Sequence, residues 1–173
     1  RFNIDVGGIE YDAKFVFESL GYNLEGNELG AAFGLTQLKS LENNIQVREG
    51  NFKKQNEFFN NYKDLFSIPK QTQNSKTAWL AYPILINSNA KFTRKEFQIY
   101  LEERKIQTRV VFTGNVMRQP MMNGVKYIKN NSGYTNADAV MERGVLLPLH
   151  HGMTNEMFHR LHETIKEFIE KYN

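Results

Sequence analysis

The sequence has no cysteine, no long apolar run and no basic cluster. Without cysteine the chain cannot form a disulfide scaffold, a thiolate zinc site or a cysteine nucleophile, and it fits a reducing compartment. Its apolar runs stay well short of the roughly 20 residues that a membrane-spanning helix needs. Residues 1–12 also lack the organisation of a signal peptide. We therefore expect a cytoplasmic chain without a membrane partner.

Charge of either sign is spread along the chain. Lys and Arg number 22 and Asp and Glu 19, so the net charge is only +3, although the calculated pI is about 9.0. Basic residues never run for more than two positions, whereas nucleic-acid-binding surfaces usually concentrate them on one face. We expect no nucleic-acid partner.

The spacing of the four histidines does not favour a metal site. His150 and His151 follow a predicted strand, where neighbouring side chains point to opposite faces. His159 and His162 are three residues apart on a predicted helix, but no glutamate of the HExxH kind accompanies them. We expect no bound metal.

The stretch from Gly21 to Leu41 combines turn residues with an unusual helix pattern. Asn27 is the expected N-cap, and leucines at three-residue spacing predict a helix over residues 27–41. Gly30 and Gly34 lie inside this helix, where glycine costs about 1 kcal/mol relative to alanine. Either another backbone or a ligand approaches closely here, or the helix is packed tightly in a core.

Helix and strand patterns alternate along the rest of the chain. Thr93 and Glu96 form a capping box and predict the start of a helix that ends near Arg104. The other expected elements are helices over residues 44–62, residues 135–143 and from residue 154 onwards, strands over residues 78–86, 108–112 and 145–149, a short strand and turn over residues 1–8, and a loop over residues 63–76. This order predicts an α+β fold in which helices cover a three-stranded antiparallel sheet, preceded by a long N-terminal helical segment.

Three motifs together give a family resemblance. They are Gly21-Tyr22-Asn23 followed by an acidic residue and residues 31–41 (AAFGLTQLKSL), residues 11–15 (YDAKF), and residues 109–120 (RVVFTGNVMRQP). The chain resembles the DegT/DnrJ-type sugar aminotransferases, pyridoxal-phosphate (PLP) enzymes that act on nucleotide-linked keto sugars. Within that family it looks most like the branch that contains the deoxysugar (hexulose) 3-dehydrases. The resemblance covers nearly the whole chain but only the C-terminal portion of the family's chain.

The resemblance implies a domain organisation and a set of partners. Residues 1–26 would be the tail end of the large PLP-binding domain, and residues 27–173 would be the C-terminal small domain of a fold-type I PLP enzyme. The chain does not begin with Met, and we expect it to be a fragment or a processed chain. The parent would be a cytoplasmic homodimer that takes a nucleotide-sugar substrate in surface polysaccharide synthesis.

The same resemblance leaves the catalytic residue outside this chain. In the family, the Schiff-base lysine, or the histidine that replaces it in the 3-dehydrases, lies well upstream of the GYN motif. Lys14 is therefore given no covalent role, and no catalytic residue is assigned. Asn23 would reach across the dimer and hydrogen-bond the cofactor phosphate, although an Asx-turn explains an asparagine here equally well.

The substrate residues are expected mainly in the loop after the strand at residues 108–112. Exposed loops after strands often carry ligand contacts, and Arg118 has the geometry to pair with a diphosphate or a sugar oxygen. A solvated arginine is the alternative. By resemblance this loop projects toward the sugar site, so Phe112, Asn115, Arg118 and His150 are the candidate substrate residues.

Two functions from different classes follow. The first is the C-terminal domain of a PLP-dependent enzyme that performs 3-dehydration or amino transfer on nucleotide-linked keto-deoxysugars. PLP or pyridoxamine phosphate (PMP) would act in the full-length parent and would bind this chain only weakly. The alternative is a non-catalytic module that binds sugar nucleotides or another protein.

Overall fold

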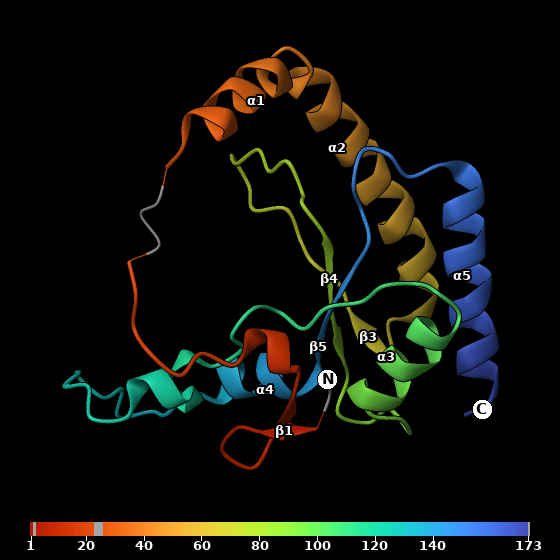
Figure 1. Cartoon of the computed structure of the whole chain (residues 1–173). Helices are drawn as coiled ribbons and strands as arrows, with labels where there is room; N and C mark the ends of the chain where they lie inside the picture. The colour runs from red at the N-terminus through yellow and green to blue at the C-terminus, as the bar shows by residue number, and fades with distance from the viewer. Residues whose placement is uncertain (2, 23–25, 173) are drawn as a thin grey trace.

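The structure is a computed structural model that describes residue 1, residues 3–22 and residues 26–172. Figure 1 shows helices arranged around a small central sheet, with α1 on an arm that stands apart from it. The helices are α1 (Glu28–Leu38), α2 (Leu41–Phe59), α3 (Arg94–Glu103), α4 (Thr135–Arg143) and α5 (Asn155–Glu170). The strands are β1 (Ile4–Asp5), β2 (Glu10–Tyr11), β3 (Phe66–Ser67), β4 (Tyr82–Ile86) and β5 (Gly144–Leu147).

The central sheet is antiparallel, in the order β3-β4-β5. Side chains alternate between its two faces, because successive residues of a strand point to opposite sides. Ile84 pairs with Val145 and faces the core, whereas its neighbour Pro83 pairs with Leu146 and faces the other side. The predicted three-stranded antiparallel sheet is confirmed, and its two faces have different surroundings.

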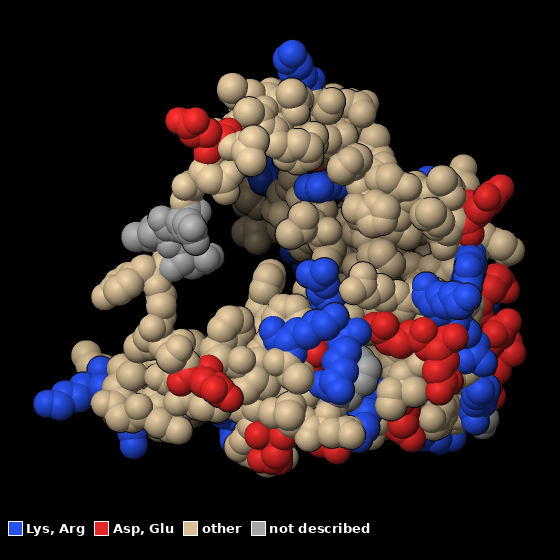
Figure 2. All heavy atoms as spheres, viewed as in Figure 1, with Lys and Arg blue, Asp and Glu red and all other residues tan. Residues whose placement is uncertain are grey.

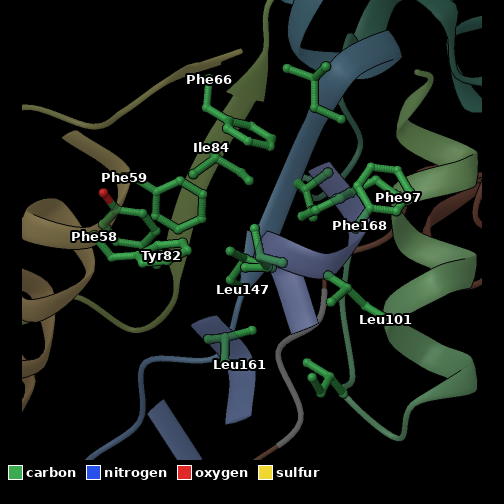
Figure 3. Close-up of a cluster of buried hydrophobic side chains, with 14 of the residues drawn as sticks. Phe58, Phe59, Phe66, Tyr82, Ile84, Phe97, Leu101, Leu147, Leu161 and Phe168 are labelled. Atoms are coloured by element: carbon green, nitrogen blue, oxygen red, sulfur yellow. The ribbon is translucent and has the colours of Figure 1, made fainter. Parts of the chain in front are cut away.

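The core lies between the sheet and the helices α2, α3 and α5. In Figure 3, Phe97 and Leu101 of α3 and Phe168 of α5 lie near Ile84 and Leu147 of the sheet. The rings of Phe97 and Phe168 meet edge to face with centroids 5.2 Å apart. Burying one such side chain contributes about 1.5–3 kcal/mol, so this cluster supplies much of the folding free energy.

The helix starts follow the local capping signals. Thr93 and Glu96 form the predicted capping box, in which Glu96 Oε2 accepts from Thr93 N–H at 2.7 Å. The Asn27 side chain accepts from Gly30 N–H at 2.7 Å and caps α1. Thr154 caps α5 in the same way by accepting from Met157 N–H at 3.2 Å. Helix α4 covers the expected residues and ends at Gly144.

Two expectations about strands are wrong. Residues 108–112 do not form a strand of the sheet, because only Arg109 makes a bridge, to Leu146, before the backbone turns away at Phe112. Strand β3 instead comes from the expected loop over residues 63–76. It is only two residues long and shows no periodicity, and its pairing with β4 is decided by the burial of Phe66 in the core.

The N-terminal segment packs against the sheet domain. Strands β1 and β2 form a hairpin, and Val6 and Tyr11 bury their side chains against Val110 and Met141. Arg1 forms an ion pair with the fully buried Asp12 at 2.7 Å. The assignment of residues 1–26 to a larger domain stays a prediction.

Helix α1 has an exposed apolar surface. None of its residues is buried, and Leu29, Phe33, Leu35 and Leu38 are between 62% and 85% exposed. The break between α1 and α2 falls at Lys39 and Ser40. Among the described helices, none is long and apolar enough to span a membrane.

Candidate functional site

A groove of about 550 Å³ lies on the face of the sheet opposite the core. Pro83 and Leu146, the outward-facing pair of β4 and β5, form its floor. Gln107, Arg109 and Val111 form one side, because the residues between them are turned toward the interior. In Figure 1 α1 stands apart from this end of the sheet, and Figure 2 shows open space between the arm that carries α1 and the rest of the described chain.

Trp79 forms a rigid aromatic part of the groove wall. Its ring stacks on Phe52 of α2, with centroids 4.2 Å apart and an interplanar angle of 7°. Phe52 is buried and also contacts Tyr82, so the indole rests on the core itself. Trp79 is only partly buried and lines the groove, so a ligand can contact it there. Trp79 is the only tryptophan in the sequence.

Phe112 presents its ring from a strained backbone. Its φ is +47°, in the left-handed region that residues with side chains rarely adopt, and its side chain is 63% exposed. Burial raises the pKa of Tyr11 to about 12, so the phenol stays protonated and donates to Phe112 O at 2.8 Å. An exposed aromatic residue held in this conformation is typical of a ligand-binding position.

Gly114 makes the tight turn after Phe112 possible. Its φ is +62°, and a Cβ atom at this position would lie 2.5 Å from the Met141 side chain. The Gln119 side chain is almost fully buried and stabilises the turn by donating to Thr113 O at 3.0 Å. The backbone of Phe112 is therefore positioned by contacts on both sides of the turn.

His150 lies at the end of the groove beyond β5. Its backbone oxygen accepts from Asn51 Nδ2 at 3.0 Å, which ties this segment to α2. Its Nδ1 accepts from Gly152 N–H at 3.1 Å. The neutral ring therefore carries its proton on Nε2, and this N–H is the group that can donate to a ligand.

Arg118 and Asn115 form a separate cluster around Asp138. Arg118 Nη2 donates to Asp138 Oδ2 at 2.8 Å, and Asn115 Nδ2 donates to Asp138 Oδ1 at 2.6 Å. The hydrogen bond from Arg118, followed by that from Asn115, lowers the pKa of Asp138 to about 2, and the same pairing raises the pKa of Arg118. Arg118 Nη1 also donates to Gly7 O at 3.1 Å.

The structure thus divides the candidate substrate residues into two groups. Phe112 and His150 line the same groove. Asn115 and Arg118 line a different pocket of about 290 Å³, and both are engaged with Asp138. Asn23 lies outside the described residues. The roles of all these residues stay predictions.

Sequence reasoning missed two residues of the groove, Arg109 and Trp79. Both were read as parts of strands, where they count as structural residues. Arg109 had one usable signal, because the alternation over residues 106–111 places an arginine on the face opposite Thr108 and Val110, both of which are buried. Among the described residues, no group of three or more His, Cys, Asp or Glu side chains is placed to hold a metal.

The groove does not fit the reacting end of PLP. The protein groups that hold this cofactor are a lysine on its carbonyl carbon and a carboxylate or arginine at its ring nitrogen. The described lining residues include no Lys, Asp or Glu, so the groove offers no amine for the carbonyl carbon, and Arg109 is the one lining residue of a kind that meets the ring nitrogen. Lys14 is exposed in the short turn η1 (Ala13–Phe15) and does not line the groove.

Two curated proteins illustrate the sequence similarity. The chain is 31% identical over 170 residues to the lipopolysaccharide biosynthesis protein RfbH of Salmonella typhimurium, covering 97% of this chain and 39% of RfbH. It is 33% identical over 173 residues to the dTDP-4-dehydro-2,6-dideoxy-D-glucose 3-dehydratase of Saccharopolyspora spinosa, covering 99% of this chain and 37% of that enzyme. The chain spans about two fifths of the length of these relatives.

A solved structure and a family match agree with this similarity. The structure of E. coli GDP-4-keto-6-deoxy-D-mannose-3-dehydratase with bound hydrated PLP superposes with a TM-score of 0.70 at 25% identity, over 92% of this chain and 41% of that one. Residues 3–166 match the sequence pattern of a single family. The chain therefore belongs to the DegT/DnrJ/EryC1/StrS aminotransferase family.

Proposed function

We propose that this chain is the C-terminal small domain of a PLP-dependent enzyme that acts on nucleotide-linked keto-deoxysugars in surface polysaccharide or deoxysugar biosynthesis. The observation that carries the proposal is the match of nearly the whole chain to about two fifths of relatives that include sugar 3-dehydratases. Residues 1–26 then belong to the end of the large domain and residues 27–173 to the small domain. The reaction is either 3-dehydration or amino transfer.

The lining of the groove suggests that this chain binds the ligand and that another part of the longer protein carries the reacting groups. The lining supplies aromatic rings, an arginine and a histidine, which bind and orient a ligand. The lysine or histidine that reacts and the carboxylate at the cofactor ring come from the portion of the longer protein that precedes Arg1. PLP or PMP, when bound there, supplies the electron sink for chemistry at the sugar. Asn23 is the residue of this chain that we assign to the cofactor phosphate.

We also propose that the longer protein is a cytoplasmic homodimer. The support is the apolar surface of α1, where Leu29 is 85% exposed and Phe33 67% exposed. Several large apolar side chains exposed on one helix commonly mark an interface. A Cβ built at Gly34 meets no other atom within 4 Å, so this side of the helix is open to a close backbone approach.

The deciding experiment uses the full-length gene product. It is incubated with PLP or PMP and a dTDP- or GDP-linked 4-keto-deoxysugar, and the products are analysed by mass spectrometry. Loss of the 3-hydroxyl identifies a dehydratase, and gain of an amino group identifies an aminotransferase. If the full-length protein has neither a reacting lysine or histidine nor affinity for the cofactor, the enzyme proposal fails and the non-catalytic binding module replaces it.

A further inference from the structure

The two arginines near the loop at residues 112–120 have different surroundings. Arg118 forms a two-pronged pair with Asp138 and a third bond to Gly7 O, so its donors are largely occupied. Arg109 is exposed and lines the groove. Within the part of the chain that the structure describes, no hydrogen bond or ion pair engages the Arg109 guanidinium. Arg109 is therefore the arginine that is free to bind an anion.

The surroundings of Arg109 favour a negatively charged ligand. No Asp or Glu lies among the described residues that line the groove, and the floor formed by Pro83 and Leu146 is apolar. An arginine without a counterion, in a groove without carboxylates, favours an anionic ligand over a cationic one. His150 Nε2–H and the Gln107 amide add neutral donors to the same groove.

A second arginine on the neighbouring helix lacks a partner for its buried nitrogen. Arg48 Nε is buried and makes no hydrogen bond to any described residue. Arg48 precedes Phe52 by four positions on α2, so the two side chains share one face of the helix. Phe52 carries the Trp79 ring that forms the groove wall. A buried donor without an acceptor is rare in folded proteins, but Arg48 does not line the groove, so the anion is assigned to Arg109 alone.

The groove also holds two aromatic side chains, one with a fixed ring and one on a fixed backbone. Trp79 is stacked on the core through Phe52, and Phe112 is held by the Tyr11 hydrogen bond to its backbone oxygen. Rigid rings lose little conformational entropy when a planar ligand stacks on them. Aromatic rings beside an unpaired cation suit a ligand that has both a planar base and phosphates.

We propose that this groove binds the nucleoside diphosphate part of the nucleotide-linked sugar, with Arg109 as its diphosphate-binding residue. The base packs against Trp79 and Phe112, and His150 Nε2–H donates to a phosphate or ribose oxygen. The inference rests on the proposed function for the class of ligand. It assigns to Arg109 the role that the sequence suggested for Arg118.

Binding of dTDP or GDP to the 173-residue chain tests this inference. The single tryptophan lies in the groove, so its fluorescence, excited at the red edge of indole absorption, reports occupancy directly. We expect a saturable change with either nucleoside diphosphate. Arg109→Gln should weaken binding about tenfold to hundredfold, the usual effect of losing a charged hydrogen bond. Lys91→Gln removes the same charge from an exposed site outside the groove and should change the affinity less than twofold.

A second pair of variants tests where the base of the nucleotide binds. Phe112→Ala should weaken binding at least about fivefold, because it removes a stacking surface. Tyr127→Ala is the matched control, since Tyr127 is an exposed aromatic residue in the pocket beside Arg118. Weaker binding in Tyr127→Ala but not in Phe112→Ala would move the site to that pocket and overturn the proposal. Inorganic pyrophosphate that binds as tightly as dTDP and GDP would overturn the placement of the base.

Three further results separate this inference from the proposed function. No saturable signal at millimolar dTDP and GDP, or equal weakening by Arg109→Gln and Lys91→Gln, overturns the groove assignment. In the full-length enzyme, turnover with an unchanged KM in Arg109→Gln does the same while leaving the proposed function intact. The opposite result is also possible: the full-length protein binds no PLP, but dTDP still binds in the groove with the expected variant pattern. That result would overturn the enzyme proposal and support the assignment of the groove.

Discussion

Helices α1 and α5 are both rich in apolar residues, yet they have opposite surroundings. In α5 the residues Phe158, Leu161, Ile165 and Phe168 recur at three- and four-residue steps and are at most 4% exposed. In α1 the apolar residues are distributed around the helix, and none of them is buried. A helix with a single apolar stripe can bury that stripe against one sheet of the same chain. A helix that is apolar on several sides needs more than one partner, and α1 finds none among the described residues.

The largest expected difference between these two helices is in stability. Phe168→Ala should lower the free energy of unfolding by about 3–5 kcal/mol, because it leaves a cavity beside Phe97 and Tyr100. Phe33→Ala, the matched change on exposed α1, should alter it by less than about 0.5 kcal/mol. Urea denaturation at low protein concentration measures both. Equal losses in the two variants would mean that α1 is packed in the folded monomer.

The exposed surface of α1 should make the chain self-associate. We expect sedimentation velocity to show a dimer that forms as the concentration rises. Leu35→Glu should weaken the dimer by about 2–3 kcal/mol, or thirtyfold to more than a hundredfold in Kd, because it places an unpaired charge in an apolar contact. Met157→Glu, a similar change at an exposed position on α5, is the control. A monomer at high concentration would show that α1 is not an interface between copies.

A pH effect is expected where α5 meets α2. Burial, followed by repulsion from Lys166 and partly offset by Glu163, lowers the pKa of His162 to about 4. Its ring stacks on Phe58 at 3.9 Å and its Nε2 contacts Gln55 Oε1 at 3.0 Å. Since the unfolded state takes up the proton first, this contribution to stability is present above pH 6.5 and is lost as the pH falls toward 4.

The size of this effect is modest because His162 is only partly buried. We expect about 1–2 kcal/mol after allowance for solvent screening. The free energy of unfolding of the wild type and of His162→Gln, measured from pH 7 to pH 4, should converge as the pH falls. His151→Gln changes an exposed histidine outside this helix and serves as the control. Parallel pH profiles for wild type and His162→Gln would contradict the assignment.

The smallest effect is expected at the Arg118–Asp138 pair. Both side chains are about one third exposed, at 38% and 31%, so the pair contributes little. Asp138→Asn should lower the free energy of unfolding by less than about 1 kcal/mol. The paired carboxylate has a depressed pKa of about 2, so its contribution is present at neutral pH and is lost only as the pH falls from about 4 through 2. A loss above 2 kcal/mol in urea denaturation would show that this cluster organises the loop.

Local signals in the sequence predicted most of the helices. The predicted caps at Asn27 and Thr93 depend on hydrogen bonds within three residues, and such bonds are unaffected by the rest of the fold. The apolar stripe of α5 could also be predicted from the sequence, because one repeated spacing determines which side of the helix is buried. The antiparallel character of the sheet and the order of its main elements followed from these patterns. The family resemblance came from three motifs and needed no structure.

The sheet edges and the groove were decided only by the tertiary structure. Strand β3 exists because Phe66 is buried beside β4, a contact between residues twenty positions apart in the chain. Arg109 and Arg118 look alike in sequence, but the partner of Arg118 lies on α4. Which arginine stays free therefore depends on a long-range pairing that no local pattern encodes. Likewise, Trp79 and Phe112 share a groove only because the sheet brings their segments together.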